Sequence, residues 1–291
     1  MNHMSQESAS LYFTIACNQQ SIEDFILEYH LDQISQVQVW YADEDLLNLE
    51  QSTQPLGIRL NIGAVQLHDD FTQQVYLWLH RLKTNTNILQ LTETYRKALH
   101  LYIQAFNEQS SGFHLTHQLL GLLSELNIEF HVHSHLNTSS EQETFTEPLT
   151  SMADTPFTIT ESASFRISSE CLTAQQLQEY FQGMRFNILF DQGLNIRSQK
   201  YLEHAQTSLL ELPSRLNSEH HDLDQHLHYL VDQLHPYQSV LRKTFFNPHI
   251  QQYIQAHGHL ENPHHRKLSV ASIKALFSMG LSLDVDYYFA C

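Results

Sequence analysis

The chain has 291 residues and a formal net charge of −17, and apolar residues make up 42% of it. This length predicts about two domains, the composition excludes a disordered chain, and no apolar run reaches the roughly 18 residues of a membrane span. Residues 1–150 hold five Lys and Arg against 18 Asp and Glu, which argues against direct nucleic-acid binding, because that role needs a basic face.

The first half alternates strand and helix patterns along the chain. Alternating apolar residues predict strands at 11–15, 37–40, 58–62, 99–106 and 128–134. Helices are predicted after the capping residues Ser21 and Thr116 and from Asp70 onward. The last of these has an apolar stripe at helical spacing, formed by Phe71, Val75, Trp78, Leu79 and Leu82.

The second half repeats this order. Strands are predicted at 163–167, 249–255 and 281–289, and helices at 173–181, 223–234 and 269–279, whereas 264–267 reads as a loop. The tetrapeptide Tyr102–Ala105 recurs as Tyr253–Ala256 about 150 residues later, a period too long for a solenoid. We therefore predict two copies of one unit.

The predicted fold class is α+β, with two similar tandem domains, each a mainly antiparallel sheet with helices packed on one face. The first domain spans residues 10–135 and the second 163–291. Residues 136–162 hold many Ser, Thr and Glu, two prolines and no Lys or Arg, which is typical of a linker.

One pattern resembles a known family. Residues 112–130 and 267–285 each combine an apolar helix with a following strand, and Ser164–Ile167 is similar to the family's opening strand. These segments resemble the uncharacterised bacterial family called domain of unknown function 4279. The resemblance implies a tandem repeat of that domain and no particular activity. By analogy, small acidic bacterial α+β domains are often immunity proteins in toxin loci.

The charge distribution predicts a protein partner. Residues 1–150 carry a net −13, whereas residues 151–291, with ten cations and 14 anions, carry −4. An acidic surface attracts basic proteins and raises the rate of encounter. We predict that the contact surface combines aromatic anchors with acidic residues, namely Trp40, Tyr41, Asp43, Glu44, Asp45, Asp69 and Asp70.

These features predict a bacterial immunity protein that neutralises a cognate toxin, basic and of nuclease type, by direct contact. The chain has no Walker loop, nucleophile elbow or zinc-protease motif, so we expect no enzyme and no cofactor. Its first residues, Met1–Glu7, lack a basic flank and an apolar segment, and its three cysteines are scattered. We expect a cytoplasmic monomer or weak homodimer without direct contact to nucleic acid or membrane.

Histidines offer an alternative. His131, His133 and His135 alternate along a predicted strand, so their imidazoles project to one side, as zinc ligands would. The matching residues of the second copy are Asp284, Asp286 and Tyr288, and this change of ligand type argues against a required metal. A histidine-dependent, zinc-binding enzyme and a non-catalytic structural module remain the alternatives to an immunity protein.

Overall fold

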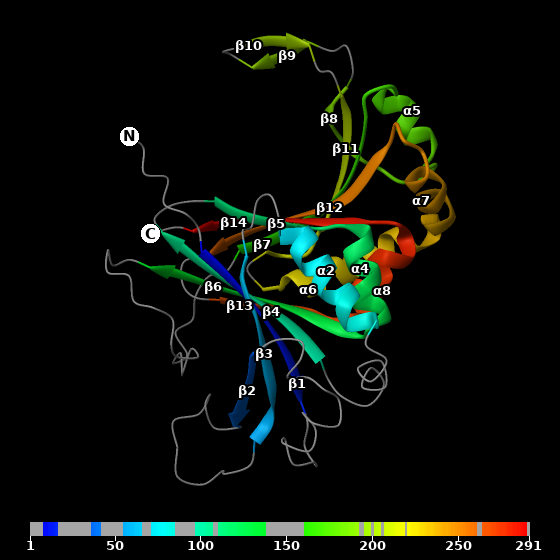
Figure 1. Ribbon diagram of the computed structural model, residues 1–291. Coiled ribbons are helices and arrows are strands. Elements are labelled where there is room, and N and C mark those ends of the chain that lie inside the picture. The colour runs from blue at the N-terminus through cyan, green and yellow to red at the C-terminus, as the bar shows by residue number, and fades with distance from the viewer. Residues whose placement is uncertain are drawn as a thin grey trace.

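The computed structural model describes residues 8–16, 36–41, 55–65, 71–84, 97–106, 110–137, 160–191, 195–198, 201–204, 207–218, 220–260 and 264–289. The first half forms β1 (Ser8–Ala16), β2 (Gln36–Tyr41), β3 (Pro55–Val65), α2 (Phe71–Thr84), β4 (Lys97–Phe106), β5 (Ser110–Leu115), α4 (His117–Glu125) and β6 (Ile128–Asn137). The second half opens with β7 (Thr160–Ser169), α5 (Ala174–Glu179), β8 (Asn187–Phe190), β9 (Asn195–Ser198), β10 (Tyr201–His204) and β11 (Ser208–Pro213). It continues with α6 (Leu223–Leu234), the short 3-10 helix η3 (His235–Tyr237), α7 (Gln238–Phe245), β12 (Gln251–Leu260), β13 (His264–Leu268), α8 (Val270–Met279) and β14 (Ser282–Phe289) (Figure 1). The helix predicted after Ser21 lies outside the described residues.

The strands form two six-stranded sheets. The first sheet has the order β13-β6-β4-β1-β3-β2, the second has the order β5-β14-β12-β7-β11-β8, and β9 and β10 pair separately. Neighbouring strands are antiparallel except for the parallel pairs β4–β6 and β12–β14. The predicted α+β class with mainly antiparallel sheets is confirmed, and the two strand orders correspond position by position.

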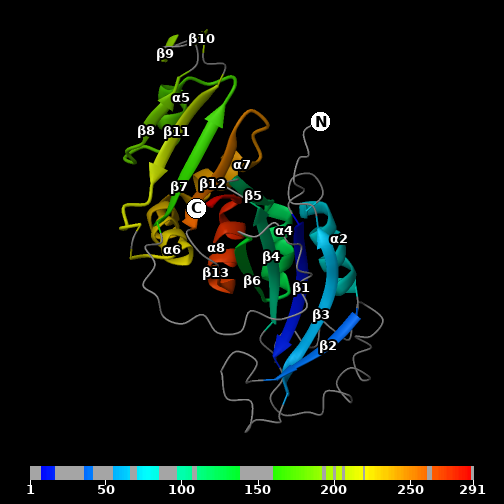
Figure 2. The ribbon, with the colours of Figure 1, turned by 90° about the vertical axis from the view of Figure 1, so that its left-hand side faces the viewer.

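Each sheet takes one edge strand from the other half of the chain. β5 of the first half pairs with β14, whereas β13 of the second half pairs with β6 (Figures 1 and 2). The prediction of a loop at 264–267 is therefore wrong, because these residues belong to β13. Its polar sequence His-His-Arg-Lys has no apolar alternation, and only the backbone of β6 makes it a strand. The division into domains at 136–162 stays a prediction, although the hydrogen bonding of the sheets crosses it.

The identical tetrapeptides do not occupy equivalent positions. Tyr102 pairs with Ser10 on β1 and with His133 on β6, whereas Tyr253 pairs with Arg166 on β7 and Ser282 on β14. When β1 and β7 are aligned on Phe13 and Phe165, Ser10 corresponds to Ser162. The partner of Ser162 on β12 is His257, four residues beyond Tyr253. The predicted equivalence of Tyr102–Ala105 with Tyr253–Ala256 is therefore wrong, because the period of a strand fixes which face a residue has but not its register.

Helices α4 and α8 pack against each other at the centre of the molecule, and both contact β6 (Figure 2). Thr116 and Ser269 begin them in the same way, since each hydroxyl accepts a hydrogen bond from a backbone N–H three residues on. Gly280 ends α8 with a φ of 74°, a conformation that glycine adopts without steric cost. The predicted cap Thr116 is therefore confirmed, whereas the predicted cap Ser21 lies outside the described residues.

The core lies between the sheets and these helices. Phe13, Leu99 and Phe130 face it from three neighbouring strands, and each is fully buried. The predicted stripe of α2 is buried along its whole length. Because side chains alternate along a strand, the next residues of β1, β4 and β6 point to the opposite face of the first sheet. That outer face carries the histidines.

Candidate functional site

Two of the predicted contact residues, Trp40 and Tyr41, lie on an edge strand of the first sheet. Trp40 and Tyr41 end β2, which is the last strand of that sheet and pairs with β3. The acidic residues predicted to surround them, Asp43, Glu44, Asp45, Asp69 and Asp70, lie outside the described residues. An edge strand presents backbone N–H and C=O groups to which another chain can pair. Trp40 and Tyr41, predicted as aromatic anchors, belong to such a strand.

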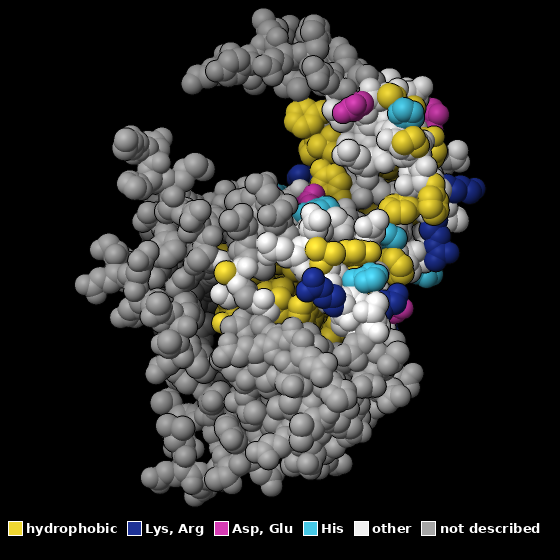
Figure 3. Space-filling view, in the orientation of Figure 1, with side chains coloured by type: hydrophobic (Ala, Val, Ile, Leu, Met, Phe, Trp, Pro, Cys, Tyr) yellow, Lys and Arg dark blue, Asp and Glu magenta, His cyan; other side chains and the backbone are white. Residues whose placement is uncertain are grey.

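The equivalent edge of the second sheet is β8, which sequence reasoning missed. Among the described residues β8 pairs with β11 alone. Its apolar residues Ile188, Leu189 and Phe190 are 55%, 40% and 41% exposed. Figure 3 shows hydrophobic side chains gathered on this part of the surface. Exposed apolar patches of this kind mark interaction sites more often than scattered single residues do.

The end of β8 is held in place by a carboxylate. Asp191 Oδ1 accepts hydrogen bonds from the backbone N–H of Ala174, at 2.7 Å, and from Ser208 Oγ, at 3.2 Å. These contacts join the edge strand to the start of α5 and to β11. The apolar side chains of β8 are thus presented on a fixed backbone, which lowers the entropic cost of binding a partner.

The histidines gather on the outer face of the first sheet. His131 and His133 share one face of β6 as predicted, whereas the side chain of His135 lies outside the described residues. His100, which the sequence analysis did not select, comes from β4, directly beside His131 in the parallel pair. The ring centroids of His100 lie 4.7 Å from His131 and 5.2 Å from His133. These three side chains are the group of the described chain that is suited to hold a metal ion.

The equivalent face of the second sheet has different chemistry. By strand register, Gln255, Asp284 and Asp286 occupy the places of His100, His131 and His133, as the sequence predicted for the two aspartates. Gln255 donates a hydrogen bond to Asp286 at 2.9 Å, and His114 pairs with Asp284. These polar groups satisfy one another, so the two sheets share a fold but not a site.

The histidines near the start of α6 differ in their exposure to solvent. Asp222 caps the helix through the backbone N–H of Gln225. His226 is buried and lies 2.9 Å from Ser214 Oγ through Nδ1, and burial lowers the pKa of its imidazole. His228 instead faces solvent, 3.5 Å from Asp224. These residues act as a helix cap and a core contact.

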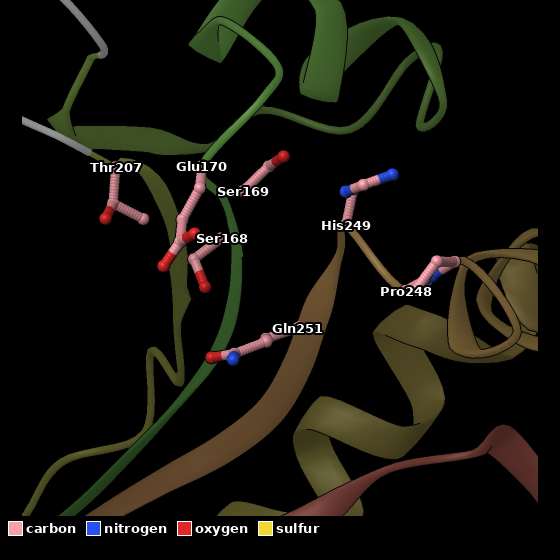
Figure 4. Close-up of a pocket in the computed structure, with 7 residues that line it drawn as sticks. All are labelled: Ser168, Ser169, Glu170, Thr207, Pro248, His249 and Gln251. Atoms are coloured by element: carbon pink, nitrogen blue, oxygen red, sulfur yellow. The ribbon is translucent and has the colours of Figure 1, made fainter.

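A small depression opens at the end of the second sheet, where β7, β11 and β12 meet (Figure 4). It is lined by Ser168, Ser169, Glu170, Thr207, Pro248, His249 and Gln251. Ser169 Oγ accepts hydrogen bonds from the backbone N–H groups of Cys171 and Leu172, so this hydroxyl shapes the turn that follows β7. His249 Nδ1 lies 3.5 Å from the exposed Cys171 Sγ, within hydrogen-bonding distance for a sulfur atom.

Comparison with models of protein families found no match for the chain, and no curated protein matches it. The resemblance to domain of unknown function 4279 therefore stays a prediction. In the described part of the chain, no helix combines the length and the apolar character that crossing a membrane requires.

Proposed function

We propose that this protein binds a partner protein directly through an edge strand of its sheets, and that the partner is a toxin which it neutralises as a cytoplasmic immunity protein. The exposed strand β8 is the observation that carries the proposal. A partner strand that adds to β8 gains main-chain hydrogen bonds, while pockets for Ile188, Leu189 and Phe190 supply selectivity. β2, with Trp40 and Tyr41, offers the equivalent edge of the first sheet.

The charge of the chain supports a basic partner. A net charge of −17 produces a long-range field that raises the association rate of a positively charged protein. Nuclease toxins are natural candidates because they need cations to bind phosphates. In this proposal the field brings the partner close, and the apolar edge strand holds it.

Co-purification with the products of neighbouring genes tests the proposal. With the partner in hand, Leu189→Lys is expected to weaken binding by about tenfold or more, because it places a charge within the apolar contact. Leu77→Lys on α2 is the matched control, since Leu77 is also exposed, at 49% against 40% for Leu189, but does not lie on an edge strand. Titration calorimetry measures both. Equal affinities of the Leu189→Lys variant and the native protein would contradict the role of β8.

Charge reversal tests the steering part of the proposal separately. Asp43→Lys or Asp45→Lys is expected to slow association and to leave dissociation nearly unchanged. The effect should be larger at low salt, because the Debye length is about 30 Å at 0.01 M salt and about 8 Å at 0.15 M. Stopped-flow association rates at the two salt concentrations measure it, and an effect independent of salt would rule out steering by these residues.

A further inference from the structure

Three imidazoles converge on the outer face of the first sheet, and their arrangement is that of a metal site. One ring nitrogen from each of His100, His131 and His133 lies within 4.8 Å of those of the other two. His100 Nδ1 and His133 Nε2 are 2.9 Å apart. We propose that these three histidines bind a zinc ion.

Hydrogen bonds on the far side of two rings select the nitrogens that face the ion. His100 Nε2 lies 2.8 Å from Thr14 Oγ1, and His131 Nε2 lies 3.1 Å from Glu129 Oε2. In each ring this leaves Nδ1 as the metal ligand. A hydrogen-bond acceptor on the other ring nitrogen, most often a carboxylate, backbone carbonyl or water, supports a metal-bound histidine because it fixes the tautomer and the orientation of the ring. Glu129 and the Thr14 hydroxyl supply such acceptors here.

The support extends to the exchanged strand. Lys267 Nζ of β13 lies 2.8 Å from Glu129 Oε1. Glu129 is thereby held between a lysine from the second half of the chain and a histidine from the first. The pairing of β13 with β6 thus brings a residue of the second half of the chain to the carboxylate that supports His131.

The third histidine is held by aromatic packing. The rings of His133 and Tyr102 are stacked, with centroids 4.3 Å apart and planes 6° from parallel. The rings of Tyr12 and Tyr102 form a T-shaped pair with centroids 5.3 Å apart. This packing restricts the rotamers of His133, so less entropy is lost when the metal binds.

The distance between His100 and His133 fits a tetrahedral ion after a small adjustment. Zinc binds histidine nitrogen at about 2.0–2.1 Å, so two nitrogens on one tetrahedral ion lie about 3.4 Å apart. His100 and His133 therefore need to separate by about 0.5 Å from their 2.9 Å contact. Three neutral imidazoles suit zinc and disfavour magnesium or calcium, which take oxygen ligands.

Among the described residues, three side chains converge on this face. His100 and His133 are half-buried rather than enclosed. Sites with three protein ligands and one water are typical of zinc that interacts with a small molecule, whereas structural zinc has four protein ligands. The proposed ion therefore carries a water that an anionic ligand can replace.

The test uses protein without a histidine tag, stripped of metal with a chelator and then titrated with Zn²⁺ in competition with a chromogenic chelator. We expect one zinc per chain that is lost in the His100→Gln and His133→Gln variants. Glu129→Gln should bind about 10–100-fold more weakly, as expected when a supporting partner of a ligand is removed. His114→Gln and His257→Gln, on the equivalent face of the second sheet, are the matched controls and should bind as the native protein does.

Two further measurements keep the test decisive. Far-ultraviolet circular dichroism of the metal-free variants checks that they fold, and if His131→Gln does not fold, the half-buried His100 and His133 carry the test. Cobalt substitution should give the strong visible bands of a tetrahedral ion. Native affinity in His100→Gln, an equal loss in the control variants, or a six-coordinate cobalt spectrum would each overturn the proposal and point to incidental binding by surface histidines.

Discussion

Replacing Arg266 with methionine is expected to lower the free energy of unfolding by about 3–5 kcal/mol, the usual cost of removing one partner of a buried ion pair. Arg266 lies on β13 in the first sheet, and its Nε donates a hydrogen bond to Glu161 Oε1 on β7 in the second sheet. The side chains of Arg266 and Glu161 are only 9% and 2% exposed. Without Arg266, the Glu161 carboxylate stays buried with its main counter-charge removed.

The loss should depend on pH in a defined direction. Burial raises the pKa of Glu161 above 4.5, and the charge and hydrogen bond of Arg266 oppose that rise. A carboxyl group with a raised pKa in the folded chain binds protons more tightly there than in the unfolded chain. Its contribution to stability therefore falls as the pH rises from 4.5 through the folded-state value. Without Arg266 this pKa rises further, so the destabilisation should be largest near neutral pH and should shrink on acidification.

Urea unfolding at several pH values measures this effect. Lys267→Met is the neighbouring control, because Lys267 points to the other face of β13 and is 38% exposed; its loss should be about 1 kcal/mol or less. The double variant Arg266→Met with Glu161→Met should recover most of the stability, since apolar replacement of a whole buried pair is often neutral. An unchanged stability of Arg266→Met would show that the pair contributes little.

The second large effect is expected on the other exchanged strand. Phe113→Ala should cost about 3–5 kcal/mol, because a buried ring is removed and the surrounding side chains fill the cavity only in part. Phe113 of β5 packs against Phe71, Phe130 and Tyr287, with ring centroids 5.9, 5.5 and 6.2 Å away. Phe71 and Phe130 belong to the first half of the chain and Tyr287 to the second, so this ring joins the two sheets.

Phe113→Leu is the matched control and should cost less than Phe113→Ala, because it leaves a smaller cavity. Thermal unfolding and urea unfolding should give one transition for both sheets in the native protein, since the exchanged strands couple them. Two well-separated transitions, or equal stabilities of the alanine and native proteins, would contradict this coupling.

Phe113 and Arg266 occupy equivalent positions in the two sheets. Phe113 pairs with Val285 of β14, and Arg266 pairs with Val132 at the corresponding position of β6. One exchanged strand thus joins the two sheets by aromatic packing and the other by a buried ion pair. Equivalent positions of the two sheets therefore hold chemically different contacts. The aligned tripeptides Phe113-His114-Leu115 and Arg266-Lys267-Leu268 share only their last residue, a buried leucine, so local sequence does not show that a ring and a guanidinium take the same place.

Local physical chemistry made most secondary structure predictable. The stripe of α2 and the caps Thr116, Thr173 and Ser269 depend on residues three or four positions apart, which a sequence displays directly. The alternation of β6 likewise placed His131 and His133 on one face. β8 was missed because its four residues, Asn-Ile-Leu-Phe, do not alternate and all four are exposed.

The sequence alone determined the acidic charge, the α+β class and the repeated order of elements, because each follows from composition or from short-range periodicity. Tertiary structure decided which strands pair. In the folded chain, β5 pairs within the second sheet and β13 within the first. The two copies of the tetrapeptide lie in different registers, and His100 lies beside His131 and His133. These contacts join residues that are distant in the sequence. The backbone hydrogen bonds between strands do not depend on side-chain identity, so no local sequence pattern predicts which strands pair.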